Sequence, residues 1–238
     1  RSMVPMLRER ADSVEENRKV SKETIRAFID AGFFKILQPR RWGGWEMNPE
    51  VFMRVLMELG RGCSSSAWNM MILGVHQWEF GHLPEQACAD VWGEDNTVLI
   101  ASSYPPAGKV TKVEGGYFLE GQWPTSSGSD HGDWAFFGGF LKDEKGVPYD
   151  RYSFLVPRSE YEIIDDWHVF GLKGTGSKSC RIKGAFVPEH RAHSMAAYEM
   201  SDRGAMYLWP FSMIFFAGVS AVICGFGQQA IEIYTEQM

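Results

Sequence analysis

The period of the apolar side chains changes twice along this chain, and these two changes limit its fold most narrowly. Up to about residue 95, apolar residues recur every three to four positions, as between Ile25 and Phe33, which predicts amphipathic helices. From Thr97, short alternating runs rich in Val, Ile, Phe and Tyr predict strands. After Pro188 the helical pattern returns. The sequence therefore predicts three successive units, a helical domain over 1–95, a β domain over 96–190 and the start of a helical bundle over 191–238.

Local signals predict where the helices of the first unit begin and end. Asn48 followed by Pro49 is typical of a helix start, and Gly60 is typical of a helix end. Further helices are expected over 64–80 and 84–93.

The β unit is predicted to form an antiparallel barrel. Strands are expected near residues 98–102, 109–113, 117–122, 134–140, 152–156, 162–165 and 179–186. The run Glu114-Gly115-Gly116 is typical of a hairpin turn. Because no helical crossover separates these strands, a sandwich or small barrel is favoured over a parallel sheet. The expected fold class is α+β, with an N-terminal helical domain, a central antiparallel β-barrel and the start of a C-terminal helical bundle.

The last helical segment is long and apolar enough to cross a membrane, since residues 204–231 carry no charge. Ala217, Ala221 and Gly225 recur at a four-residue spacing, which lets another helix approach closely. We therefore expect a buried bundle helix rather than a membrane span. The pattern is still helical at Met238, so the chain is expected to be incomplete.

Charge and cysteine usage exclude several classes of partner and compartment. The formal net charge of −6 argues against a nucleic-acid partner, because phosphate binding needs a basic surface. The four cysteines show no metal-finger spacing and are typical of a reduced intracellular protein. No secretion signal is recognised at the N-terminus, so a cytoplasmic location is expected.

Three motifs that could carry chemistry fail on physical grounds. The glycine-rich run from Gly171 to Gly176 does not follow the order of a dinucleotide fingerprint. Ser129, Asp130 and His131 are adjacent in one loop, where they cannot line up as a hydrolase triad. His190 and His193 are spaced like a metal pair but lack a cysteine or carboxylate cluster, so they are interpreted as surface or loop histidines.

Three other features are candidates for a functional site. The loop from Trp123 to His131 combines a flat apolar ring with hydroxyls and free amides, which a flavin ring needs. Trp68 and His76 lie eight residues apart, about two helical turns, and can share one helix face. The run Ser102-Ser103-Tyr104 closes the first predicted strand. The alternatives are a hydroxyl-rich turn, a satisfied core histidine and an ordinary strand end.

Taken together, these motifs resemble the oxygenase components of two-component aromatic hydroxylases built on the acyl-CoA dehydrogenase fold. The resemblance covers nearly the whole chain in order. It includes Gly32-Phe33-Phe34, Trp42-Gly43-Gly44, Gly74-Val75-His76, Gly121-x-Trp123, Ser126-Ser127-Gly128, Gly171 to Ser177 and Phe186-Val187-Pro188.

The resemblance implies a flavin-dependent monooxygenase that hydroxylates a phenolic or related aromatic substrate through a flavin C4a-hydroperoxide. It implies reduced FMN or FAD as cofactor, dioxygen as co-substrate, a separate flavin reductase as partner and a homotetramer. Position by position, Ser127 is implied near flavin N5, and His76 with Ser102 as the pair that holds the substrate hydroxyl, with His76 as general base. Trp68 is implied as a wall of the same pocket. The flavin-binding set is Trp123, Thr125, Ser126, Ser127, Gly174, Thr175, Gly176 and Ser177.

Two other functions remain open at this point. An acyl-CoA dehydrogenase shares the fold but oxidises a thioester with FAD, and the loop from Ser126 to His131 favours the oxygenase. A non-catalytic flavin-fold scaffold is the alternative from another class.

Overall fold

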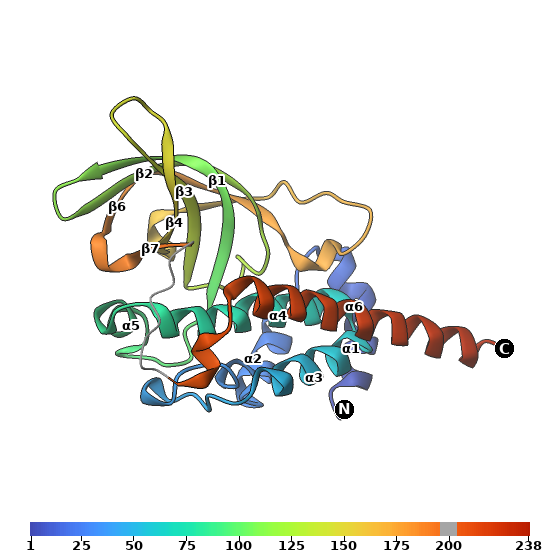
Figure 1. Ribbon diagram of the computed structural model, residues 1–238. Helices are drawn as coiled ribbons and strands as arrows, with labels where there is room; N and C mark the ends of the chain where they lie inside the picture. Colours follow the sequence, from blue (N-terminus) through green and yellow to red (C-terminus); the bar gives the residue numbers. More distant parts are fainter. Residues whose placement is uncertain (196–203) are drawn as a thin grey trace.

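The computed structural model describes residues 1–195 and 204–238 and has two layers, a helical layer and a β-sheet that covers it (Figure 1). The predicted helices of the first unit are confirmed as α2 (Lys22–Asp30), α3 (Pro49–Gly60), α4 (Ser64–Glu79) and α5 (Glu85–Trp92). They are preceded by α1 (Val4–Glu16), for which no separate helix was predicted. Helix α3 begins as predicted, because the Asn48 side chain accepts a hydrogen bond from the backbone N–H of Glu50 at 2.9 Å.

The strands form one open, mixed sheet, so the predicted closed antiparallel barrel is wrong. They are β1 (Ile100–Val113), β2 (Gly116–Ser126), β3 (Trp134–Lys142), β4 (Pro148–Pro157), β5 (Glu162–Ile164), β6 (Lys178–Pro188) and β7 (Ala192–Ser194), in the order β5-β6-β2-β1-β3-β4-β7. β1 and β3 are parallel, and the other neighbours are antiparallel. The loop after β2 crosses the N-terminal end of β1, where Gly132 packs against Ala101. After this crossing the chain enters β3 in the same direction as β1, so the two strands pair in parallel.

Two predicted strands, near 98–102 and 109–113, are one long strand, β1. Its ladder with β3 is interrupted between Ser103 and Gly108, where Pro105 and Pro106 lie. Proline is compatible with a strand at such an irregularity because no ladder hydrogen bond is needed there. The hairpin predicted at Gly115 is confirmed, with Gly115 at φ +75° between β1 and β2.

Helix α4 lies beneath the sheet, with α2 and α3 on its other side and α6 packed beside it (Figure 1). Nearly all of its residues are buried, which is why its apolar pattern is spread around the whole helix. One hydrophobic cluster runs through both layers and includes Phe52, Met70, Trp123 and Phe137. Helix and sheet therefore share a core, and the division at residue 95 stays a prediction.

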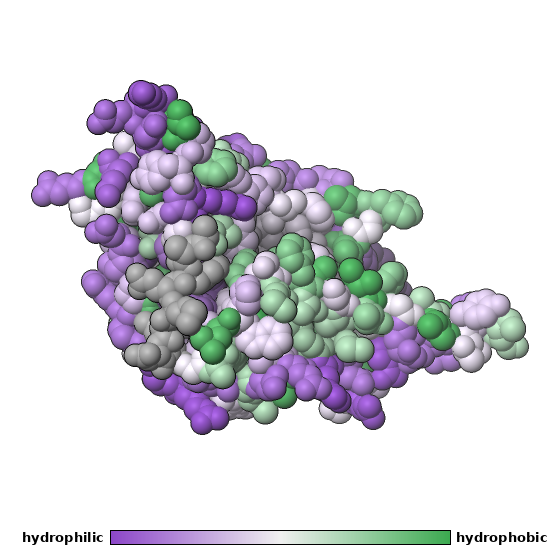
Figure 2. Space-filling view, viewed as in Figure 1, coloured by the Kyte–Doolittle hydropathy of each residue, from purple (hydrophilic) through white to green (hydrophobic). Residues whose placement is uncertain are grey.

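Helix α6 (Phe211–Glu236) packs on α3 and α4 through only one face. Its buried residues are Ile214, Gly218, Ala221, Val222 and Gly225. The predicted bundle helix is thus only partly buried within the described chain, and Ala217 lies on the exposed side. By length and composition this 26-residue helix could cross a membrane, and 28% of its apolar window is buried. Figure 2 shows the resulting hydrophobic surface over α6.

Candidate functional site

A cavity of about 400 Å³ opens where α4, the start of β1, the end of β2 and the start of α6 meet. It gathers six of the residues predicted from the sequence. They are Trp68, Ser102, Thr125, Ser127, Thr175 and Ser177. Ile72, one helical turn after Trp68, also lines the cavity, so the first part of the predicted Trp68–His76 face points into it.

A chain of hydrogen bonds runs along one wall of this cavity. The indole N–H of Trp68 donates to Ser127 Oγ at 3.0 Å. Ser127 and Ser177 are joined at 2.6 Å, and Ser177 and Thr175 at 2.7 Å. The chain ends where Thr175 donates to the carbonyl of Leu172 at 2.8 Å. Because a carbonyl can only accept, Thr175 donates to Leu172, Ser177 donates to Thr175, and Ser127 donates to Ser177. Each hydroxyl oxygen therefore keeps one lone pair that can accept a hydrogen bond from a ligand.

The backbone beside the cavity is held in an uncommon conformation at two positions. Thr125 and Leu172 line the cavity with φ of +55° and +54°. Residues other than glycine rarely adopt this left-handed region, which costs about 1–3 kcal/mol and is concentrated at functional sites. The strain at Thr125 coincides with an interruption of the β2–β6 register between Trp123 and Ser126.

This interruption explains where Trp123 and Ser126 lie. The Trp123 indole donates to the carbonyl of Gly138 at 2.7 Å, and its ring packs on Phe137 in the core. Ser126 is fully buried opposite Lys178 of β6. Neither side chain lines the cavity, so the structure separates both of them from Thr125 and Ser127.

The glycines of the predicted flavin loop shape the loop rather than line the cavity. The loop contains the 3₁₀ turn η5 (Lys173–Thr175), whose amides at 173 and 174 donate to the Glu15 carboxylate of α1. A side chain on Gly174 would meet Val14 Cγ1 at 2.2 Å. Gly176 adopts φ +55°. Both glycines therefore allow the close approach and turn that bring Thr175 and Ser177 to the cavity.

His76 lies behind the cavity wall and belongs to a buried polar cluster. Its Nδ1 is 2.9 Å from Glu79 Oε2 and 3.0 Å from the hydroxyl of Tyr104, which itself lines the cavity. The other carboxylate oxygen of Glu79 is 3.0 Å from His193 Nε2. Burial by itself raises the pKa of Glu79, but hydrogen bonds from His193 and His76 outweigh it and hold that pKa at about 2.

The sequence analysis named Tyr104 only as part of the run that closes the first strand, did not single out Glu79, and interpreted His193 differently. A glutamate three residues after His76 was a usable signal, because that spacing brings two side chains together on a helix. His193 belongs to β7 and its side chain is 13% exposed, so the interpretation as a surface histidine is wrong for it. His190 pairs with Asp90 instead. No group of metal-binding side chains occurs within the described ranges.

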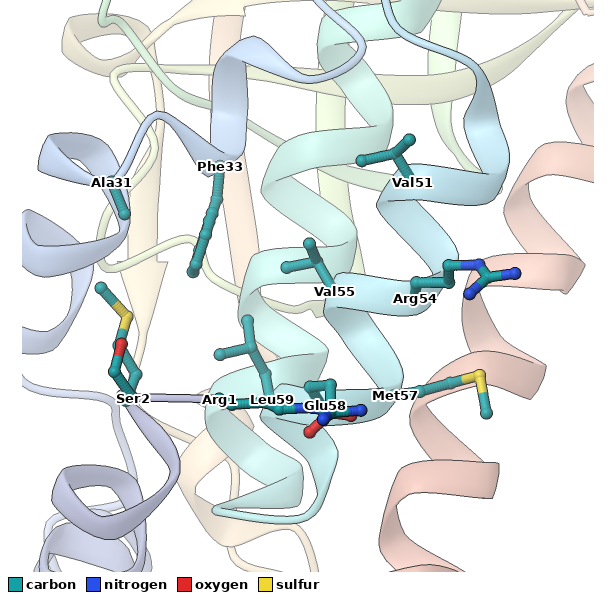
Figure 3. A pocket seen from close by; sticks show the side chains of 11 residues that line it. Arg1, Ser2, Ala31, Phe33, Val51, Arg54, Val55, Met57, Glu58 and Leu59 are labelled. Atoms are coloured by element: carbon teal, nitrogen blue, oxygen red, sulfur yellow. The ribbon is translucent and has the colours of Figure 1, made fainter.

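The largest cavity, about 660 Å³, is a different place and contains none of the predicted residues. It lies between the N-terminus, helix α3 and the segment that follows α2. Figure 3 shows Phe33, Val55 and Leu59 around one apolar space there. Arg1 and Glu58 form an ion pair of 3.2 Å beside it. Its walls offer no buried polar cluster, so we assign the site to the smaller cavity.

A third cavity, about 390 Å³, adjoins the candidate site and shares Trp68 and Leu172 with it. Its walls are mostly apolar and include Val222 and Phe226 of α6.

Comparison with known proteins gives consistent relationships. Residues 3–82 match the family model of the acyl-CoA dehydrogenase N-terminal domain. The chain is 40% identical to the flavin-dependent monooxygenase oxygenase subunit HsaA of Mycobacterium tuberculosis, covering 99% of this chain and 61% of that protein. It is 34% identical to the p-hydroxyphenylacetate 3-hydroxylase oxygenase component of Acinetobacter baumannii, covering 99% and 57%.

A solved structure supports the same relationship. The crystal structure of 3-HSA hydroxylase from Rhodococcus sp. RHA1 superposes with a TM-score of 0.95 at 38% identity, covering 99% of this chain and 62% of that one. The chain thus spans about three fifths of the length of these relatives.

Proposed function

Since the chain is a relative, in sequence and in fold, of the oxygenase components of two-component flavin-dependent monooxygenases, we propose that it carries the flavin and substrate site of such an enzyme. The relationship confirms the resemblance that the sequence motifs predict. The proposed reaction is the hydroxylation of a phenolic or related aromatic substrate by dioxygen. The observation that carries the proposal is the hydroxyl chain of Ser127, Ser177 and Thr175 beside Trp68 in one cavity.

The residues of this cavity fit a reduced flavin. Its volume falls within the range of about 300–1,000 Å³ that small-molecule sites occupy. A reduced flavin carries a proton on N5 and is a donor there, and the spare lone pair of Ser127 is an acceptor. Bound reduced flavin would supply the activation of dioxygen that the side chains cannot provide.

The role of each predicted flavin residue follows from its position. Ser127, Thr175, Ser177 and Thr125 line the cavity and are proposed to hold the flavin, with Trp68 as an apolar wall. Gly174 and Gly176 are proposed to support it indirectly by shaping the loop. No contact supports a direct role for Trp123 or Ser126.

His76 and Ser102 are proposed to bind the substrate hydroxyl. Ser102 lines the cavity, and His76 lies directly behind Tyr104. The Nε2 atom of His76 is buried and has no hydrogen-bond partner among the described residues. An unpaired buried nitrogen costs about 1–3 kcal/mol unless a ligand satisfies it, which favours a substrate hydroxyl as its partner. His76 would take the proton of that hydroxyl as general base.

The remaining features of the proposal concern partners. Relatives are named as oxygenase components or subunits, and one is an FADH₂-dependent resorcinol hydroxylase. We therefore propose that a separate reductase supplies reduced FMN or FAD. We also propose a homotetramer, which the resemblance implies, and a cytoplasmic location, which the sequence predicts.

Incubation of the intact protein with reduced flavin, isotopically labelled dioxygen and a panel of phenols tests this function. We expect a hydroxylated product that contains one labelled oxygen atom. Bleaching of bound flavin by an acyl-CoA, with no labelled product from any phenol, would instead support the acyl-CoA dehydrogenase alternative. Absence of both reactions would favour a scaffold.

A further inference from the structure

The carboxylate of Glu79 is the centre of an array built from three elements. It stands at the end of α4 and is fully buried. His76 from the same helix and the hydroxyl of Tyr104 from β1 both contact Oε2, and His193 from β7 contacts Oε1. Among the described residues, these are the titratable groups that face Glu79. Arg151 of β4 lies beyond Tyr104 and donates to its carbonyl at 2.9 Å.

The contacts of His193 determine its protonation. Its Nε2 faces the Glu79 carboxylate at 3.0 Å, and its Nδ1 faces the carbonyl of Ser194 at 3.1 Å. Both partners only accept hydrogen bonds, because a carbonyl and an ionised carboxylate have no proton to give. Each ring nitrogen must therefore carry a proton, so His193 is an imidazolium that neutralises the buried charge of Glu79.

The same reasoning fixes the tautomer of His76. Its Nδ1 faces the carboxylate at 2.9 Å and must donate, which leaves the lone pair on Nε2. Its Nε2 is buried without a hydrogen-bond partner among the described residues, and a proton there would have no acceptor, so the resting ring is neutral. The ring is also fixed in orientation, because Phe136 packs edge-on against both His76 and His193 at 5.8 Å between ring centroids.

We propose that Glu79 and His193 are positioning residues that hold His76 in the neutral Nδ1–H form, so that its Nε2 is the atom that accepts the proton of the substrate hydroxyl. This inference rests on the proposed function, in which His76 is the base. When His76 has taken that proton it becomes a cation, and Glu79 is the adjacent negative charge that stabilises it. The low pKa of Glu79 is consistent with a carboxylate that stays ionised throughout.

The protonation states can be measured without turnover. Long-range nitrogen–proton NMR spectra of the intact protein with labelled histidine should show His76 as the Nδ1–H tautomer and His193 as doubly protonated near neutral pH. Resonances are assigned from His76→Asn and His193→Gln. A wild-type spectrum with the proton of His76 on Nε2, or with neutral His193, overturns the proposal.

Kinetics separate the inference from the function on which it rests. His76→Asn should slow hydroxylation by roughly 100-fold or more, with partial recovery at high pH, where the phenol ionises without a base. Glu79→Gln should slow it by about 10–100-fold, as expected when a supporting partner is lost, with the same recovery at high pH. Glu79→Asp keeps the charge and should retain more activity than Glu79→Gln. Addition of Glu79→Gln to His76→Asn should cause little further loss, because both act through one group.

Each outcome is informative. A normal hydroxylation rate in His76→Asn would show that His76 is not the base, and it would contradict the proposed substrate-binding role of this residue. A slow His76→Asn beside a normal Glu79→Gln leaves the base in place and overturns the positioning role. Glu85→Gln is the control, since Glu85 pairs with Arg41 at the surface and should leave the rate and its pH profile unchanged. If Glu79→Gln does not fold, the wild-type NMR spectrum still decides.

Discussion

Ser127 joins the indole of Trp68 to the other hydroxyls of the cavity wall. Ser127→Ala removes one link, and the stability cost should be on the order of 1 kcal/mol for a single hydrogen bond. If the hydroxyl holds the flavin, the mutant should divert more reducing equivalents to hydrogen peroxide and fewer to product. The ratio of peroxide to hydroxylated product measures this. Thr111→Ala, which removes an exposed hydroxyl of β1, is the control, and equal ratios in both variants would contradict the assignment.

At the same scale, sequence reasoning reached some site residues and missed others for physical reasons. Thr175 and Ser177 were implied by the resemblance to the hydroxylases, and Ser127 also belongs to a loop whose hydroxyls and free amides suit a flavin. Trp123 was placed with them because a flat apolar ring in the same predicted loop suits a flavin. In the structure Trp123 belongs to β2, the left-handed Thr125 interrupts the register after it, and a left-handed threonine has no sequence signature. His193 reaches Glu79 only through the pairing of β7 with β4, which local pattern does not reveal.

At the scale of elements, helix ends were predicted well and the sheet less well. Caps such as Asn48 act within a few residues, so the sequence contains the whole signal. The parallel pairing of β1 and β3 depends on how one loop crosses the end of β1, which is a tertiary event. Strand β1 was predicted as two strands because the prolines at 105 and 106 are typical of a break between strands.

The contact of α3 with α6 gives a prediction at this scale. A side chain on Gly225 would lie 2.3 Å from the Met57 carbonyl oxygen and 3.0 Å from Gly60 Cα, and neither backbone atom can move away independently. Gly225→Ala should therefore lower stability by about 1–3 kcal/mol, as overpacking does. Gly227→Ala is the matched control, because no described atom lies within 4 Å of its added carbon. It should be neutral or stabilising by up to about 1 kcal/mol, since alanine is the better helix former. Urea unfolding midpoints decide, and equal shifts would contradict the close crossing.

At the scale of the whole molecule, α6 presents two different surfaces. One face is packed on α3 and α4, and its C-terminal part is joined to the helical layer by Glu232, which pairs with Arg61 at 2.7 Å and with Arg8. The opposite face carries exposed apolar residues such as Phe216, Ile223 and Phe226. The ion pairs hold α6 along the helical layer, which supports the prediction of a bundle helix over a membrane span.

The topology of the whole molecule also bears on where reducing equivalents come from. Nicotinamide cofactors are commonly bound where a parallel strand turns directly into a helix whose N-terminal amides hold the pyrophosphate. Within residues 1–195 and 204–238 the sheet has a single parallel pair, β1 with β3, and the strand that joins them is an antiparallel hairpin arm rather than a helix. The glycine-rich run at Gly171–Gly176 leads through a 3₁₀ turn into β6.

We therefore expect the intact protein to consume neither NADH nor NADPH by itself, even with flavin and oxygen present, because the described residues contain no parallel strand that turns into a helix to hold a nicotinamide cofactor. Hydroxylation should proceed when flavin is reduced chemically or by an unrelated reductase, since only the diffusing reduced flavin has to reach the cavity. Nicotinamide absorbance, followed with and without added reductase, is the measurement. Rapid nicotinamide oxidation by the protein alone would contradict the two-component assignment. Product formed only with one particular reductase would show that delivery requires contact between the two proteins.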